Sequence, residues 1–285
     1  FESFAKDCGI KLPFEYIKLD PLYTVNFGIG QPAFHLYKDI KKLSAQFKDM
    51  EPNFEENFNK YLKKAEALFN DTVDIVIKQN FKSILHYLIT LMKVNPVHLP
   101  VLTKNFYEHV NQYFTNKQVK QIISLVAFFL GRTPFDTNAI YSLLSYTEFK
   151  HDGYHNVKGG MYKITEGLVE ELKKENVEFH YNTEIIDFEA NDNKLLALID
   201  KQKRKWNADI HVINSDAAVF RNRVFKREKY SLERLDKMEW TMGYLTMYVG
   251  IKTKIPNARH HNYYLGDNFD EYARDVYKNP TTLQK

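Results

Sequence analysis

The hydrophobic and polar positions divide the chain into a helical first half and an alternating second half. Residues 14–27, "FEYIKLDPLYTVNF", have the pattern of extended chain broken by a turn at Asp20-Pro21. From Leu36 onward the spacing becomes helical, with Leu36, Ile40, Leu43 and Phe47 on one face. The sequence therefore predicts strands first and helices from about residue 36.

Four further helices follow in this pattern. The second opens at Pro52, and its buried stripe consists of Phe54, Phe58, Tyr61, Ala65 and Leu68. The third covers 80–93 and the fourth covers roughly 102–114. The fifth begins at Thr115, where Thr115 and Gln118 have the spacing of a capping box, and ends at Gly131. We therefore expect residues 36–131 to be a helical block.

After residue 150, helix and strand patterns alternate. A helix over 161–174 precedes strand patterns at 177–181, 184–190, 194–200, 208–214 and 239–251, with a tight turn at 191–193. The apolar run in 208–214 has the character of a buried strand with a polar carboxyl end. The whole pattern predicts an α/β fold of mixed α+β type, with a β-meander inserted into a sheet domain.

Composition and charge exclude several classes of function. The 285 residues carry 40 basic and 36 acidic side chains, a net charge of +4 that does not favour nucleic-acid binding. The single cysteine, Cys8, excludes an internal disulfide and fits a reducing compartment. The chain begins at Phe1 in a helical pattern and stops without a cap, so we expect a piece of a longer protein.

Two motifs resemble ligand sites but do not fit them. Gly28, Gly30 and Ala33 match a dinucleotide-binding loop, but the region that should hold its second strand and acidic residue has a helical pattern. We interpret these residues as a turn. His260 and His261 are adjacent, so on a strand they would point to opposite faces and could not chelate one ion. We predict no metal site.

Two consecutive glycines precede the helix at 161–174, in "HNVKGGMYKITEGLVEEL" (155–172). A turn into a helix with positive φ accounts for one glycine. The second suggests close approach of the backbone to a flat or bulky group, next to the free N–H groups of a helix N-terminus.

These glycines occur in a series of segments that together resemble one family. The segments are, in order, 129–146 ("FLGRTPFDTNAIYSLLSY"), the Gly-Gly-Met helix, 182–188 ("NTEIIDF"), 213–220 ("INSDAAVF") and 258–272 ("ARHHNYYLGDNFDEY"). The chain resembles bacterial-type phytoene desaturases, FAD-dependent carotenoid desaturases of the amine-oxidase superfamily. The resemblance implies four segments: the start of a substrate-binding sheet (1–35), a helical lid facing the membrane (36–131), the central part of a two-layer FAD-binding domain (132–226), and a further part of an antiparallel substrate sheet (227–285). It also implies that the pyrophosphate-binding loop and the C-terminal part of the flavin site lie outside these residues, so we expect this stretch alone to be inactive and to bind FAD weakly.

The resemblance also implies which residues contact the cofactor and the substrate. For FAD these are Gly159, Gly160, Met161 and Ile185; to these we add Asn214 and Asp216, which follow the strand predicted at 208–214, where open sheets bind ligands. A capped turn leaving the sheet is an equally good interpretation of Asn214 and Asp216. For a long apolar polyene the residues are Phe135, Tyr141, Tyr154 and Tyr162. The flavin takes the hydride in such a reaction, and we name no catalytic residue.

Other interpretations stay open. A related carotenoid isomerase, ketolase or retinoid saturase would share these motifs, and a non-catalytic helical module for membrane association is a candidate from another class. Residues 81–93 ("FKSILHYLITLMK") and 119–131 ("VKQIISLVAFFLG") both have apolar faces edged by lysines, which suits either core helices or helices lying in a membrane interface. With the resemblance, they predict a cytoplasmic protein held peripherally on the inner face of the cytoplasmic membrane. The sequence predicts no oligomeric state.

Overall fold

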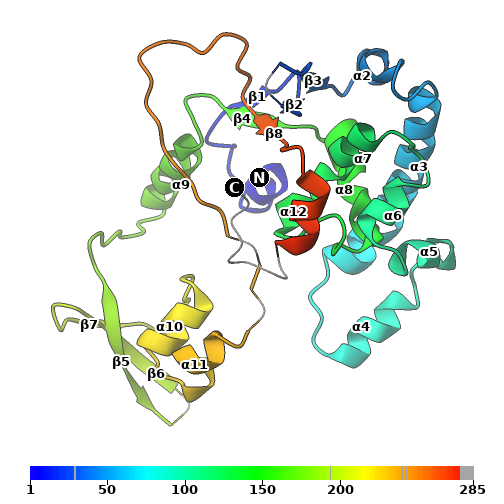
Figure 1. The fold of residues 1–285 in the computed structure, drawn as a ribbon. Helices are drawn as coiled ribbons and strands as arrows, with labels where there is room; N and C mark the ends of the chain where they lie inside the picture. Colours follow the sequence, from blue (N-terminus) through cyan, green and yellow to red (C-terminus); the bar gives the residue numbers. More distant parts are fainter. Residues whose placement is uncertain (29, 193, 239, 242, 277–285) are drawn as a thin grey trace. The chain divides into compact units, whose positions relative to one another are not determined.

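The computed structural model describes residues 1–28, 30–192, 194–238, 240–241 and 243–276 (Figure 1). The chain forms two compact units, Phe1–Thr165 with Thr241–Lys285, and Glu166–Trp240. Helix α9 begins in the first unit and continues into the second. The fold is mixed α/β with small open sheets, as the sequence predicts.

Six α-helices lie in the predicted block 36–131: α2 (Ile40–Phe47), α3 (Phe54–Thr72), α4 (Ile84–Leu91), α5 (Leu99–Leu102), α6 (Phe106–Val110) and α7 (Lys117–Ser124). The helices α1 (Glu2–Asp7), α8 (Leu143–Tyr146) and α12 (Phe269–Asp275) lie outside it, and α9 (Tyr162–Lys174) spans the boundary between the two units. A 3-10 turn, Leu125–Leu130, continues α7 up to Gly131, whose φ of 69° is left-handed. A glycine at this place ends a helix without the steric cost that a Cβ atom brings.

Two small sheets complete the first unit. Strands β1 (Tyr16–Lys18) and β4 (His155–Val157) pair antiparallel. Strand β2 (Tyr23–Asn26) lies between β3 (Phe34–Leu36), which is antiparallel to it, and β8 (Asn262–Tyr264), which is parallel. The sheet that brings strands from 1–35 and 227–285 together is therefore mixed, whereas the prediction was an antiparallel sheet. The pairing of β2 with β8 also joins segments more than 230 residues apart in the sequence.

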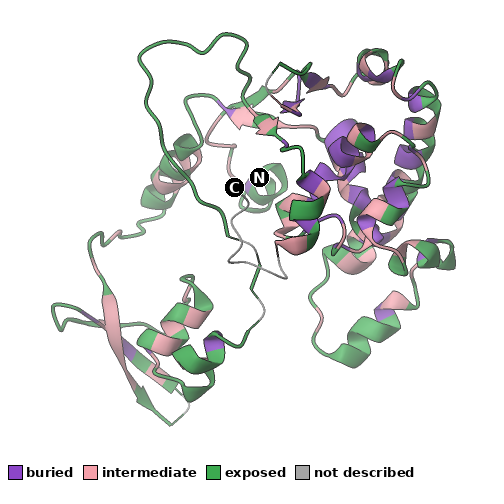
Figure 2. Cartoon of the chain, in the orientation of Figure 1, coloured by how far each residue is buried: buried purple, intermediate pink, exposed green. Residues whose placement is uncertain are grey.

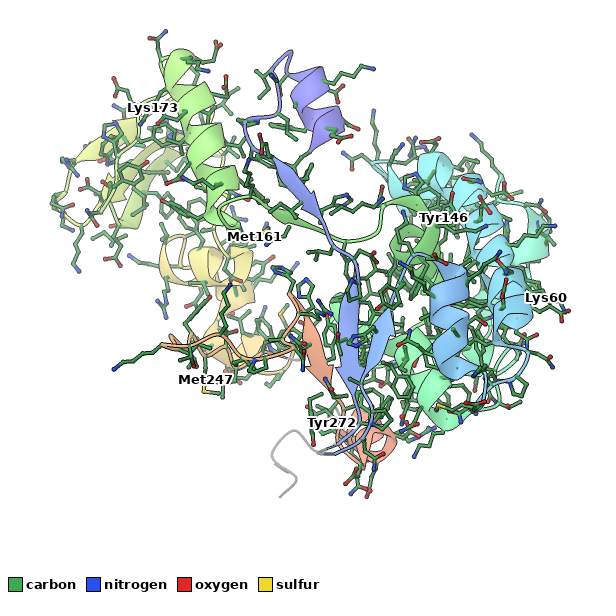
Figure 3. The ribbon with its side chains drawn as sticks, turned by 90° about the horizontal axis from the view of Figure 1, so that it is seen from above. Lys60, Tyr146, Met161, Lys173, Met247 and Tyr272 are labelled. Carbon is green, nitrogen blue, oxygen red and sulfur yellow. The ribbon has the colours of Figure 1, made fainter. Side chains whose placement is uncertain are left out.

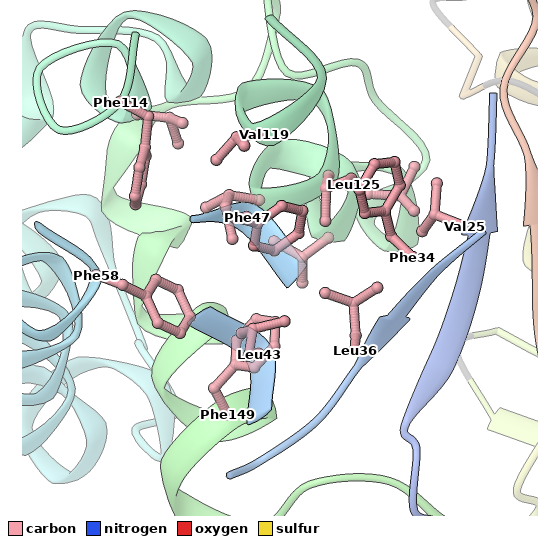
Figure 4. Close-up of a cluster of buried hydrophobic side chains, with 14 of the residues drawn as sticks. Val25, Phe34, Leu36, Leu43, Phe47, Phe58, Phe114, Val119, Leu125 and Phe149 are labelled. Carbon is pink, nitrogen blue, oxygen red and sulfur yellow. The ribbon is translucent and has the colours of Figure 1, made fainter. Parts of the chain in front are cut away.

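The core of the first unit is a continuous cluster of aromatic and aliphatic side chains (Figure 4). Phe54 and Phe58 on α3 are fully buried in it. Phe47 lies 4.8 Å from Phe54, and Phe149 lies 5.0 Å from Phe58, measured between ring centroids. Such tilted and edge-on contacts between buried rings add to the stabilisation that burial of the rings provides. The stripe predicted for α3 is buried in full.

The start of α7 differs from the prediction. Asn116, not Thr115, is the N-cap, and its side chain accepts hydrogen bonds from the backbone N–H groups of Gln118 and Val119. Thr115 instead donates its N–H and its hydroxyl to the buried carboxylate of Glu51. The capping box was wrong because a tertiary partner competes for Thr115, and a local pattern cannot reveal such a partner.

The second unit is a three-stranded antiparallel meander with two short helices. Its elements are β5 (Ile185–Asn191), β6 (Lys194–Asp200), β7 (Lys205–Asn207), α10 (Ala217–Arg223) and α11 (Leu232–Leu235). The strands predicted at 184–190 and 194–200 are confirmed as the hairpin of β5 and β6, with Asp192 in its tight turn; Asn193 lies outside the described residues. The third strand, β7, was not among the predicted strands.

Three predicted strands do not form among the described residues. Residues 177–181 and 208–214 are irregular, and so are the described residues of 239–251, of which Glu239 and Met242 lie outside the description. Ile210 and Val212 are largely exposed. An apolar run becomes a strand only when a neighbouring strand accepts its backbone hydrogen bonds, and the run itself does not specify that neighbour.

Candidate functional site

The first unit contains an apolar pocket of about 480 Å³, here called the aromatic pocket. Its lining residues come from the 3-10 turn after α7, from the stretch that runs from β8 into α12, and from the irregular segment at Tyr244: Leu125, Phe128, Phe129, Tyr244, Tyr263, Tyr264, Leu265, Gly266, Asn268, Phe269 and Tyr272. Figure 3 shows Tyr272 on α12. This size lies within the range of small-molecule sites, and the aromatic walls suit an apolar ligand.

Polar contacts join α12 to α7 and so hold two walls of the aromatic pocket together. Asp270 accepts a hydrogen bond of 2.7 Å from Gln121, and its other carboxylate oxygen lies 3.4 Å from Lys117. Phe128 packs against Phe269 with their ring centroids 5.6 Å apart. The pocket is therefore held by side chains about 150 residues apart in the sequence.

A smaller pocket of about 310 Å³, here called the Tyr154 pocket, shares two walls with the first. Its lining residues are Phe129, Gly153, Tyr154, His155, His261 and Tyr263, and Phe129 and Tyr263 also line the aromatic pocket. His261 packs edge-on against Tyr154, with 6.1 Å between the ring centroids. Burial, together with the neighbouring His260, lowers the pKa of His261, so its imidazole is neutral at pH 7.

The two adjacent histidines do not behave as predicted. They precede β8, which begins at Asn262, and their ring centroids lie 4.4 Å apart. Because they are outside the strand, the alternation of side chains does not separate them. Among the described residues, no three His, Cys, Asp or Glu side chains are grouped as metal ligands would be.

Both glycines of the pair Gly159-Gly160 have a backbone conformation that favours glycine. Gly159 has φ 84° and Gly160 has φ 98°, a region that other residues rarely adopt. The turn from β4 into α9 therefore accounts for both glycines, and not only for the one that the sequence pattern assigns to it. A Cβ atom at Gly160 would meet nothing within 4 Å, so the backbone here is open to an approaching group. Met161 (Figure 3) and Tyr162 follow at the start of α9 and are exposed.

Ile185 lines a pocket of about 350 Å³ in the second unit. Ile186, Val219, Phe220 and Val224 give it apolar walls, and Glu184, Ser215 and Arg223 add polar groups. Asp216 is the N-cap of α10 and accepts the N–H of Val219 at 2.7 Å, while Asn214 is exposed. Because 208–214 is not a strand, the capped-turn interpretation holds for Asp216.

The four predicted substrate residues do not come together. Tyr154 lines a pocket, but Tyr141 and Tyr162 are exposed, and Phe135 packs elsewhere. Phe135 lies 4.7 Å from the ring of Tyr107, and the Arg274 guanidinium lies 3.7 Å above it. Within the segments 129–146 and 258–272, the residues that line the aromatic pocket are Phe129 and seven residues of the run Tyr263–Tyr272. The dense aromatic spacing of that run was the available signal.

Glu148 is a buried acid that the sequence did not indicate. It lies in the wide helical turn Thr147–His151 and is 4% exposed. Burial raises the pKa of its carboxyl to about 7, although the hydroxyls of Tyr23 and Tyr154 act to lower it. Only the tertiary structure brings Tyr23, Tyr154 and this glutamate together, so local spacing could not have identified it.

Comparison with known proteins identifies one class of relatives. No protein-family model matches the chain. The chain is 24% identical to a phytoene desaturase of Fusarium fujikuroi, over 98% of this chain and 49% of that protein. It is 24% identical to a 4,4'-diapolycopen-4-al dehydrogenase of Metabacillus indicus (97% and 55%) and to a carotenoid 3,4-desaturase of Haloarcula japonica (98% and 57%).

The chain is therefore homologous to carotenoid desaturases, a class of oxidoreductases. It spans about half the length of the curated relatives that it matches. The resemblance inferred from the motifs is confirmed at this level.

Proposed function

We propose that the full-length protein is an oxidoreductase that removes hydrogen from a carotenoid polyene, with FAD as hydride acceptor. The observation that carries this proposal is the similarity to carotenoid desaturases along nearly the whole chain. The aromatic pocket supports it, because a polyene offers no hydrogen-bonding groups and binds through apolar contact. The named relatives are desaturases and one dehydrogenase, which favours desaturation over the isomerase, ketolase and saturase alternatives.

The residues around Ile185 fit one end of the cofactor. The apolar walls of the Ile185 pocket suit a flat adenine ring, and Ser215 and Arg223 suit the hydroxyl and phosphate groups attached to it. The open backbone at Gly160 leaves space beside the start of α9 for the flavin ring. When bound, the flavin supplies a two-electron acceptor for the hydride. The protein's own residues bind the polyene, orient it and exclude water.

The aromatic pocket is the part of the chain that we assign to the polyene. Tyr263, Phe269 and Phe128 would contact it, while Asn268 and the tyrosine hydroxyls are the polar groups on the walls. Tyr154 remains a proposed substrate contact through its smaller pocket. Phe135, Tyr141 and Tyr162 would have to contribute from outside both pockets.

A substitution at Gly266 tests the polyene site. Gly266 lines the aromatic pocket, does not have a positive φ, and has no atom within 4 Å of where a Cβ would lie. In the full-length protein expressed in a phytoene-producing host, we expect Gly266→Phe to fill the pocket and abolish the longer conjugated product. Gly243→Phe is the matched control, since Gly243 is equally unhindered and does not line the pocket. A normal yield of product from Gly266→Phe would contradict the assignment. Gly160→Leu is less informative, because bulk and backbone strain would act together there.

We further propose that α4 attaches the protein to the inner face of the cytoplasmic membrane. Ile84, Leu85, Leu88, Ile89 and Met92 are all exposed, and Lys82 and Lys93 flank them. Within the described residues, no helix is both long and apolar enough to cross a bilayer. An exposed apolar helix edged by lysines suits the interface of an anionic lipid surface, from which a lipophilic substrate would enter.

A further inference from the structure

Four side chains from different elements meet beside the Tyr154 pocket. Tyr23 on β2 stacks on Tyr154, which precedes β4, with 5.6 Å between the ring centroids. Tyr263 on β8 contacts Tyr23 edge-on at 5.3 Å. Glu148 is close enough to interact electrostatically with all three tyrosines and with Tyr61 on α3. A carboxyl group is thus enclosed by tyrosines, and two of these, Tyr154 and Tyr263, also line the pocket.

Glu148 is incompletely satisfied in this enclosure. Its Oε1 atom and the Tyr154 hydroxyl are buried, and neither has a hydrogen-bond partner of normal geometry among the described residues. Glu51, which is equally buried, shows the contrast: its carboxylate accepts from the N–H groups of Thr115 and Asn116 and from the Thr115 hydroxyl. Buried polar atoms without partners are rare and call for an explanation, because each costs its full desolvation energy.

The position of Tyr154 supplies a route between this carboxyl and the pocket. The Tyr154 side chain lines the pocket, and its hydroxyl interacts with Glu148. A tyrosine hydroxyl both accepts and donates a proton. Although the Tyr154 hydroxyl is itself buried, its ring lines the pocket, so a substrate that moves past the ring could give a proton to this oxygen while the oxygen gives its own to the carboxylate. Burial in a largely apolar site also keeps the carboxyl basic enough to accept a proton near neutral pH.

We propose that Glu148 holds the proton released when the polyene is desaturated, and that Tyr154 passes it from the pocket. This proposal rests on the proposed function. A –CH2–CH2– unit loses a hydride from one carbon to an oxidised flavin. The adjacent C–H bond breaks, its electron pair forms the second carbon–carbon bond, and its proton goes to the Tyr154 oxygen while the Tyr154 proton moves to Glu148. A bound flavin would accept the two electrons of the hydride, and Glu148 becomes neutral until it releases the proton to water.

The first test is the pH dependence of turnover in the full-length, flavin-loaded protein. The wild-type rate should rise as the pH passes about 7, where the carboxylate of Glu148 forms. Glu148→Gln should lower turnover by about 10² to 10⁴, the usual contribution of a positioned acid or base, and should remove this step from the pH profile. Glu51→Gln is the matched control: it alters a buried carboxyl that binds backbone groups, so the pH step should remain.

Tyr154→Phe keeps the ring and removes only the hydroxyl. Because that hydroxyl makes no hydrogen bond of normal geometry with a described residue, this variant should stay folded but should turn over slowly. Tyr113→Phe is its control, since the buried Tyr113 hydroxyl is also without a partner, and Tyr113 does not line either pocket. The Tyr154 variant therefore decides the question even where Glu148→Gln fails to fold.

A second readout does not depend on turnover. Infrared difference spectra of the full-length protein without substrate should show the carbonyl band of a protonated carboxylic acid that disappears as the pH rises through about 7. The band should be absent in Glu148→Gln and present in Glu51→Gln. If Glu148→Gln turned over at the wild-type rate and with the wild-type pH profile, the proton-holding role would be overturned and the proposed function would stand. A wild-type protein that never lengthens the conjugated chain would overturn both.

Discussion

Residues 81–93 and 119–131 have the same sequence pattern and opposite surroundings. Both are apolar helical runs edged by lysines. In the second, Val119, Ile122, Ile123, Leu125 and Val126 are buried in the core. In the first, most apolar side chains of α4 are exposed, with Ile84 at 80% and Met92, directly after the helix, at 84% (Figure 2).

The difference lies in the neighbours and not in the helices themselves. The apolar side of α7 lies in the same buried cluster as the strands β2 and β3 and the aromatic face of α3. The α4 segment, by contrast, has one buried residue, Thr90, and that side chain bonds to the backbone of His86 in its own helix. Two helices of equal hydrophobicity can therefore be a core helix and a surface helix that is available for lipid. Substitutions in the two helices should differ in their effect on the free energy of unfolding.

The largest expected effect on the free energy of unfolding comes from a substitution in the buried core. Phe58 is fully buried among Phe54, Phe114 and Phe149. Phe58→Ala should lower the free energy of unfolding by about 3 to 5 kcal/mol, because it removes apolar contact and leaves a cavity. Leu85→Ala on α4 should change it by less than about 0.5 kcal/mol, because that side chain is already in contact with solvent. Urea denaturation of the two variants measures both values. A cost at Leu85 close to that at Phe58 would mean that α4 is packed like α7.

The next largest effect is a pH dependence of the free energy of unfolding, caused by the buried carboxyl group of Glu148. Its pKa is raised from 4.5 to about 7 in the folded state, so the folded state binds more protons than the unfolded state between these values. The stabilising contribution of the protonated group is complete below about pH 4.5 and is lost as the pH rises to about 7. A shift of this size corresponds to about 3 kcal/mol.

Denaturation of wild type and Glu148→Gln at several pH values checks this effect. The difference in stability between the two proteins should change over that window and become constant above it. A difference that stays the same from pH 4.5 to 7 would show that Glu148 titrates normally.

The smallest effect on stability is expected where the effect on membrane binding is greatest. The double variant Leu85→Glu, Met92→Glu places two charges on the exposed side of α4 and should leave the free energy of unfolding within about 0.5 kcal/mol of the wild type. Co-sedimentation with anionic vesicles should be lost, because the charges oppose insertion of the apolar face.

Leu232→Glu on α11 is the matched control for this variant, since Leu232 is also exposed and lies on another helix. It should sediment with the vesicles as the wild type does. Equal binding by the double variant and the wild type would show that α4 is not the attachment surface.

The sequence predicted much of the local structure. The stripe of α3, the end of the fifth helix at Gly131, the helix at 161–174 and the meander of β5 and β6 all follow from periodicity and turn residues. These features depend on contacts between residues close in the chain, or on a face that must be buried by something. The family resemblance also came from the sequence, because ordered motifs survive at low identity.

The tertiary structure decided what each pattern was used for. It paired β2 with β8, gave Thr115 to Glu51, left 208–214 unpaired, and assembled the two pockets around Phe129 and Tyr263. It also enclosed Glu148 among tyrosines from other elements, which made an ordinary glutamate a candidate for holding a proton. Periodicity specifies that a face is apolar and a turn residue specifies where the chain bends. Which distant segment covers that face depends on the packing of the whole unit, and so the identity of the site residues was determined only there.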